Sequence, residues 1–116
     1  LNPWLGPESI EPYLSYQDRG SIVLCRTSNQ DSAWLQAFDN GSVGREPYLA
    51  VARKAQEWNS KGNVMLVAGA TYTDELCAIR DAAGDDVGLL VPGIGAQGGD
   101  IESAFRAGAD SRGFGV

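Results

Sequence analysis

The segment 63–91, NVMLVAGATYTDELCAIRDAAGDDVGLLV, decides the fold class of this chain. It begins with the apolar run 63–68 and ends with a second run, 87–91, and neither run alternates between apolar and polar residues. Continuous apolar runs of this length are typical of strands covered on both faces, as in a parallel sheet. The residues between them carry apolar side chains at helical spacing and end in Gly84, which predicts a helix over 75–83. The segment therefore predicts a strand–helix–strand unit.

The same alternation extends in both directions from this unit. A third apolar run, 21–25, lies upstream, and residues 113–116 predict the beginning of a fourth strand. Strands that alternate with helices imply a parallel sheet with right-handed crossovers. Residues 38–46 are rich in turn formers and predict a surface loop. The remaining helical patterns predict helices over 31–38, 47–58 and 101–107.

Length, composition and charge exclude several classes of protein. With 116 residues and 43% hydrophobic and 21% charged residues, the chain has the size and composition of one globular domain. The net charge of −6 argues against a general binder of nucleic acids or membrane surfaces, because both partners are polyanionic. Nor is there an apolar run of the length that a membrane span needs. We therefore expect neither nucleic acid nor membrane as a partner.

The sequence contains no histidine, which excludes a zinc finger and any Ser-His or Cys-His catalysis within these residues. Cys25 and Cys77 both stand among apolar neighbours. They are interpreted as small buried hydrophobic residues in a reducing cytoplasm, with a disulfide as the alternative. Trp4, Trp34 and Trp58 are spread along the chain and are expected to pack in the core or at its edge.

The segment 91–100, VPGIGAQGGD, is the most informative for function. Its glycines let the backbone approach a ligand closely and adopt positive φ. Amides at the start of the following helix carry partial positive charge, which favours a phosphate, and Gln97 adds a side-chain donor there. A tight strand-to-helix turn without a ligand is the alternative.

The same segment matches the G-x-G-x-x-G pattern of dinucleotide-binding domains at Gly93, Gly95 and Gly98. A Rossmann-type domain also has an acidic residue about 20 positions later, on the next strand. The sequence ends at Val116, before that criterion can be applied. Pro92 and the adjacent pair Gly98-Gly99 are more typical of the phosphate loop of a barrel than of a Rossmann-type domain.

Polar residues follow the first predicted strand directly, in the segment 25–29, CRTSN. The carboxyl ends of the strands form the ligand site in parallel α/β proteins. Ser28 is therefore a candidate for hydrogen bonding to a planar heterocycle, with a helix-capping role as the alternative. The next strand end, 69–71, is expected to face the same site, with Thr71 as a helix cap and a ligand contact as the alternative role. Arg26 is expected to pair with a carboxylate, without a catalytic role.

Three strand-end segments, LCRTSN at 24–29, VAGAT at 67–71 and LVPGIGAQGGD at 90–100, together resemble orotidine 5′-phosphate decarboxylase. The opening NPWLG at 2–6 is similar to the segment after the fourth barrel strand in the longer bacterial branch of that family. The resemblance covers essentially the whole chain. It implies an α/β fold, a partial (β/α)8 TIM barrel with parallel strands and crossover helices, from the end of strand 4 to the start of strand 8. Residues 1–116 are then expected to be part of a single barrel domain truncated at both ends.

The resemblance also implies roles for individual residues. Gln97 would contact the substrate phosphate, and backbone groups around Gly95 and Gly98 would line the same pocket. Ser28 would bind the edge of the pyrimidine ring. Pro92 would shape the wall of that pocket.

The catalytic residues that the resemblance implies are absent from this sequence. The family's Asp-x-Lys-x-x-Asp motif, which follows strand 3 and supplies the proton-donating lysine, does not occur here. The phosphate-binding arginine after strand 8 would lie beyond Val116, and Arg112 precedes that strand, so the role is not assigned to it. We therefore expect no catalytic residue within 1–116 and no activity from these residues alone.

For the full-length protein, the resemblance implies a lyase of de novo pyrimidine biosynthesis. It would convert orotidine 5′-phosphate to uridine 5′-phosphate and CO2 without a metal or an organic cofactor. A nucleoside monophosphate is the expected ligand, and a homodimer in the cytoplasm is the expected form. The alternatives are a non-catalytic nucleotide-phosphate binding module, a Rossmann-type dinucleotide-binding domain, and a barrel enzyme with another sugar-phosphate substrate.

Overall fold

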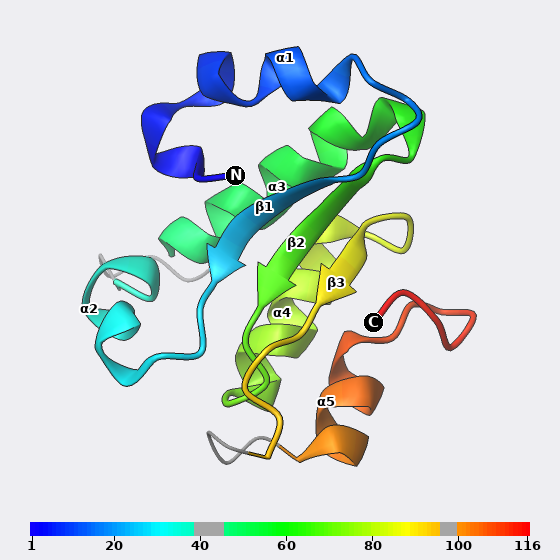
Figure 1. Cartoon of the computed structure of the whole chain (residues 1–116). Helices are drawn as coiled ribbons and strands as arrows, with labels where there is room; N and C mark the ends of the chain where they lie inside the picture. Colours follow the sequence, from blue (N-terminus) through cyan, green and yellow to red (C-terminus); the bar gives the residue numbers. More distant parts are fainter. Residues whose placement is uncertain (39–45, 96–99) are drawn as a thin grey trace.

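The computed structural model describes residues 1–38, 46–95 and 100–116. These residues form a three-stranded sheet in the order β1-β2-β3, built from β1 (Ser21–Arg26), β2 (Val64–Ala68) and β3 (Gly88–Leu90) (Figure 1). Both pairs of neighbouring strands are parallel. The strand order and direction confirm the predicted parallel sheet.

Helices connect the strands at the positions that the sequence predicts. The α-helices are α1 (Glu11–Leu14), α2 (Ala33–Gln36), α3 (Pro47–Trp58), α4 (Thr73–Ala83) and α5 (Ile101–Gly108). Short 3₁₀ helices are η1 (Pro3–Leu5), η2 (Pro7–Ser9), η3 (Gln30–Ser32) and η4 (Asn59–Lys61). The helix expected over 31–38 is thus shorter and divided between η3 and α2, and most of the expected loop 38–46 lies outside the described residues.

Local chemistry explains where the longer helices begin and end. Pro47 occupies the first turn of α3, where its missing N–H costs nothing. Asp100 caps α5 by accepting a hydrogen bond of 2.8 Å from the Ser103 amide. Gly84, with φ of 75°, ends α4. These three signals were readable from the sequence and are confirmed.

The core lies between the sheet and helices α3 and α4, which pack behind it (Figure 1). Along β2, Val64, Leu66 and Ala68 are buried and alternate with residues that are only partly buried. On the opposite face, Ile22 and Leu90 are exposed. The prediction of strands covered on both faces is therefore wrong for the described residues, because their helices cover one face only.

Backbone hydrogen bonds continue the ladder at both edges of the sheet. The Leu1 amino group donates to the Ile22 carbonyl at 2.6 Å, and the Leu24 amide donates to the Leu1 carbonyl at 2.8 Å, as in a parallel strand pair. At the other edge, the Leu89 amide donates to the Gly115 carbonyl at 2.7 Å. Residues 113–116 are not assigned as a strand, but Gly115 lies where a fourth strand would begin beside β3.

The two cysteines differ in environment. Cys25 is buried, and burial raises the pKa of its thiol to about 12. Cys77 is exposed, so the prediction that both are buried is wrong for Cys77. It lies on α4, whose buried side is formed by other residues, among them Leu76 and Ile79.

The predicted packing of the tryptophans holds for one of the three. Trp58 packs against the core, whereas Trp4 and Trp34 are 71% and 76% exposed. Trp4 and Trp34 lie on η1 and on the four-residue α2, and such short helices bury no complete face. Among the described residues, none of the helices combines the length and apolarity that crossing a bilayer requires.

Candidate functional site at the strand ends

The carboxyl ends of the three strands open on one side of the molecule, toward which all three arrows point (Figure 1). Two hydrogen bonds join the segments that follow the strands. The Gly69 amide donates to the Arg26 carbonyl at 2.7 Å, and the Ala70 amide donates to the Pro92 carbonyl at 2.8 Å. The strand ends thus converge on a common rim, which is the position of ligand sites in parallel α/β proteins.

A cleft of about 350 Å³ lies on this rim, between the loop after β1 and the loop after β2. Its lining residues are Ser28, Asn29, Gln30, Thr71 and Tyr72. The lining side chains are polar or, for Tyr72, amphipathic. The predicted ligand residue Ser28 therefore lies in a concave polar site.

Gly69 allows the two loops of the cleft to approach each other. A Cβ atom at Gly69 would lie 2.9 Å from the Ser28 Cα and 3.0 Å from the Ser28 nitrogen. Such distances are shorter than side chains tolerate against backbone. The glycine is therefore required by the contact with Ser28.

The loop that carries Ser28 is held by side chains of α2 and η3. The Thr27 amide donates to Gln36 Oε1 at 2.9 Å, and the Ser32 hydroxyl donates to the Asn29 carbonyl at 2.5 Å. The Ser28 hydroxyl itself has no hydrogen-bond partner among the described residues. The flanking backbone is fixed and the hydroxyl is left available to a ligand.

Arg26 lies beneath the cleft and is 1% exposed. Its Nε donates to Glu75 Oε2 at 2.6 Å, and its Nη1 donates to the Thr27 carbonyl at 3.0 Å and to the Ser32 hydroxyl. Its guanidinium carbon lies 5.1 Å from the centre of the Tyr72 ring. The expected pairing of Arg26 with a carboxylate is confirmed.

Thr71 does not cap α4, which corrects the sequence-based expectation. The N-cap of α4 is Tyr72, and no side chain makes the capping hydrogen bond. The Thr71 hydroxyl oxygen is buried and has no hydrogen-bond partner among the described residues. A buried hydroxyl without a partner is unfavourable, so Thr71 joins Ser28 as a group at the cleft with unused hydrogen-bonding capacity. Nothing in the local sequence distinguishes this threonine from a cap.

The segment after β3 forms the third part of the rim. Gly93 and Gly95 have φ of 94° and 74°, values that favour glycine. Apart from its chain neighbours, no atom of the described residues lies within 4 Å of the position that a Cβ would take at Gly95, so this part of the described structure leaves open space there. Pro92 is exposed and is tied to the loop after β2 through its carbonyl. Gln97 and Gly98 lie outside the described residues.

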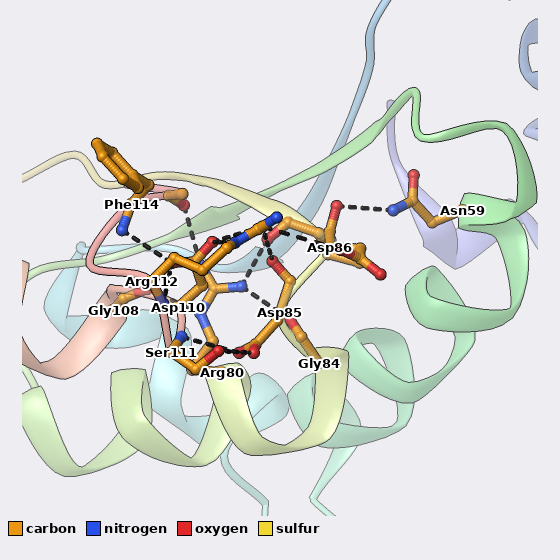
Figure 2. A network of polar contacts seen from close by, with 12 residues as sticks. Asn59, Arg80, Gly84, Asp85, Asp86, Gly108, Asp110, Ser111, Arg112 and Phe114 are labelled. Atoms are coloured by element: carbon orange, nitrogen blue, oxygen red, sulfur yellow. Dashed lines mark hydrogen bonds and ion pairs between the residues drawn. The ribbon is translucent and has the colours of Figure 1, made fainter.

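The opposite ends of the strands carry a dense polar network (Figure 2). Arg80, 6% exposed, donates to four backbone carbonyls at 2.7 to 2.9 Å. The acceptors are the carbonyls of Gly84, Val87, Gly108 and Gly115. Desolvation lowers the pKa of Arg80, and the nearby Asp110 and Asp85 oppose that change. The network joins α4, α5 and the start of β3.

Arg112 belongs to this network and not to the cleft. Its Nη2 lies 2.7 Å from Asp110 Oδ2 and 3.8 Å from Asp86 Oδ1, and Asp86 precedes β3 (Figure 2). Arg112 is therefore at the end of the strands away from the cleft. Within the described ranges, no group of three or more histidine, cysteine or acidic side chains is placed to hold a metal ion.

Comparisons with known proteins agree with this geometry. No family model matches the chain. Orotidine 5′-phosphate decarboxylases of Dechloromonas aromatica and Bordetella pertussis are each 52% identical to it over 117 aligned residues, covering 100% of this chain and 42% of each relative. The chain is homologous to a portion of orotidine 5′-phosphate decarboxylase. It thus spans about two fifths of the length of these relatives, and the predicted family resemblance is confirmed.

Similar solved structures support the fold. Leishmania donovani UMP synthase matches with a TM-score of 0.89 and 43% identity, covering 98% of this chain and 25% of that one. Leishmania donovani OMP decarboxylase matches with a TM-score of 0.85 and 39% identity, covering 98% of this chain and 43% of that one. The parallel strands and helices of this chain are thus those of a partial (β/α)8 barrel, as the sequence predicts.

Proposed function

We propose that the full-length protein is an orotidine 5′-phosphate decarboxylase and that residues 1–116 are part of its single barrel domain. The observation that carries the proposal is the convergence of Ser28, Pro92 and Gly95 on one rim of a chain that is 52% identical to these enzymes. The exposed apolar face of the sheet is the face that a closed barrel turns inward. The homology also favours this reading over a Rossmann-type domain, although the glycine pattern is common to both.

The chain's own residues bind the substrate in this proposal. The glycine-rich segment holds the phosphate, with Gln97 and the backbone near Gly95 and Gly98 as hydrogen-bond donors. Ser28, which lines the cleft, binds the edge of the pyrimidine ring. Pro92 forms part of the wall.

The reaction breaks the bond between the ring carbon and the carboxylate, and the electron pair stays on the ring carbon while CO2 leaves. Family resemblance assigns the proton that replaces the carboxylate to a lysine outside residues 1–116. Stabilising this developing charge is an electrostatic task, and binding of the remote phosphate helps to align the ring. We further propose that the enzyme works as a homodimer in the cytoplasm, without a metal or an organic cofactor.

The test is turnover of orotidine 5′-phosphate by the full-length protein, followed by the loss of orotidine absorbance and by CO2 release. We expect conversion, and Gln97→Ala is expected to raise KM by about 10-fold or more, since one charge-assisted hydrogen bond is removed. Failure to convert the substrate at saturation would refute the decarboxylase.

A non-catalytic nucleotide-binding module is the second candidate, because residues 1–116 lack the Asp-x-Lys-x-x-Asp motif. Calorimetry separates it from the first. Binding of uridine 5′-phosphate without turnover supports the module, whereas preference for NAD supports a dinucleotide-binding domain.

A further inference from the structure

The side chain of Arg26 is buried because β1 is irregular at its end. The register with β2 shifts between Leu24 and Arg26, and the burial pattern changes from alternation to two successive buried residues, Cys25 and Arg26. Irregularities of this kind redirect a side chain and are frequent beside functional sites. Here the shift directs a guanidinium group under the cleft.

The contacts of Arg26 divide between the two loops that form the cleft. Toward the loop after β1 it donates to the Thr27 carbonyl and to the Ser32 hydroxyl. Toward the loop after β2 it pairs with Glu75, in the first turn of α4, and lies against the Tyr72 ring. One rigid, planar group thus contacts both sides of the site.

We propose that Arg26 and Glu75 form a positioning pair that sets the separation of the two cleft loops, and so the placement of Ser28 against a bound nucleotide. A buried ion pair is costly unless its geometry and hydrogen bonds are nearly complete. Lysine has the same charge but lacks the planar fork, so it cannot make the contacts to Glu75, Thr27 and Ser32 together. The nucleotide part of this inference rests on the proposed function; the coupling of the loops does not.

The chain supplies a matched control in Arg80. Both arginines are buried, at 1% and 6% exposure, and each guanidinium group donates several hydrogen bonds to other groups of the protein. Arg80 belongs to the network at the opposite ends of the strands (Figure 2), and none of its four carbonyl acceptors belongs to a residue that lines the cleft. Replacing either arginine is therefore expected to lower the stability of the protein. Only the replacement of Arg26 is expected to change ligand binding at the cleft.

The experiment compares the full-length wild-type protein with Arg26→Lys and Arg80→Lys. The measurements are the Kd of uridine 5′-phosphate by calorimetry well below Tm, and amide hydrogen exchange by mass spectrometry. Arg26→Lys is expected to weaken binding by about 10-fold, since small misplacements in a site are expensive. It is also expected to accelerate exchange in both 27–36 and 69–76. Arg80→Lys is expected to lower Tm, to accelerate exchange in 84–90 and 108–116, and to leave Kd unchanged.

A wild-type Kd in Arg26→Lys, or faster exchange in only one of the two cleft loops, would overturn the inference. If Arg26→Lys does not fold, Glu75→Gln takes its place, because it removes the charge from the partner while keeping its size. Should the wild-type protein fail to bind uridine 5′-phosphate, the proposed function fails. The exchange comparison then still decides whether the pair couples the loops.

Discussion

Replacing Gly69 by alanine tests the close approach of the two cleft loops. The new Cβ would lie 2.9 Å from the Ser28 Cα, whereas ordinary contacts begin at 3.4 Å, so the Ser28 backbone must retreat by about 0.5 Å. Gly69 does not have a positive φ, so the alanine adds little backbone strain of its own. The contact with Ser28 is the expected source of the effect.

The expected cost of Gly69→Ala is about 1–3 kcal/mol in the free energy of unfolding, the range for overpacked sites. In a domain of roughly 150–250 residues, each kcal/mol lowers Tm by about 2–4 °C. The displaced Ser28 is also expected to weaken binding of uridine 5′-phosphate by about 10-fold, as misplacement of a contact group by a fraction of an ångström does. Thermal unfolding and calorimetry on the full-length protein measure the two effects.

Gly20→Ala is the control for this prediction. Gly20 precedes β1 at the end away from the cleft, is exposed, and has no atom within 4 Å of a built Cβ. It is expected to leave nucleotide binding unchanged and to alter the free energy of unfolding by no more than about 1 kcal/mol, in the stabilising direction. If Gly69→Ala matched Gly20→Ala in both Tm and Kd, the claim that Gly69 is needed for the position of Ser28 would be refuted.

Three further predictions concern the core, the acid range and the thiols. Leu66→Ala, at a fully buried position of β2, is expected to cost about 2–5 kcal/mol in urea unfolding; a loss below this range would mean that the surrounding core collapses around the shortened side chain. Hydrogen bonds from the Phe114 amide and from Arg112 lower the pKa of Asp110, so its stabilisation is present above the unfolded pKa near about 4 and lost as pH falls through the folded value. Between neutral and acid pH, the free energy of unfolding is therefore expected to fall less in Asp110→Asn than in the wild type. An equal dependence of that free energy on pH in the two proteins would contradict the prediction. Iodoacetamide at mildly alkaline pH is expected to label the exposed Cys77 and to spare Cys25, whose buried thiol has a pKa of about 12; peptide mapping measures this, and labelling of Cys25 in the native protein would contradict it.

The elements whose signals are local could be predicted from the sequence. Apolar runs marked the strands, and Pro47, Gly84 and Asp100 marked helix ends, because a cap or a breaker acts within one turn. Ser28 could be placed at the site because parallel strand ends share one edge. These inferences needed no knowledge of which segments touch.

The features that sequence analysis missed depend on contacts between distant segments. The requirement for Gly69 comes from Ser28, and the burial of Arg26 comes from a register shift and from Glu75, which is 49 residues away. The lack of a partner for Thr71 is likewise visible only when neighbouring loops are in place. Periodicity and capping rules carry no information on such pairings.

Two hydroxyl groups at the cleft end of the strands have unused hydrogen-bonding capacity, which supports the proposed place of the ligand. At one end, Arg80 and Asp110 engage backbone carbonyls and amides with direct hydrogen bonds (Figure 2). At the other, the hydroxyls of Ser28 and Thr71 have no partner among the described residues, and the space beside Gly95 is open. Buried polar groups are normally hydrogen-bonded, so the buried Thr71 hydroxyl oxygen is a candidate to bind a molecule that enters from solvent, and the partly exposed Ser28 hydroxyl is a second candidate. A polar ligand with a ring edge and an anionic group fits that capacity, and the substrate of the proposed decarboxylase has both.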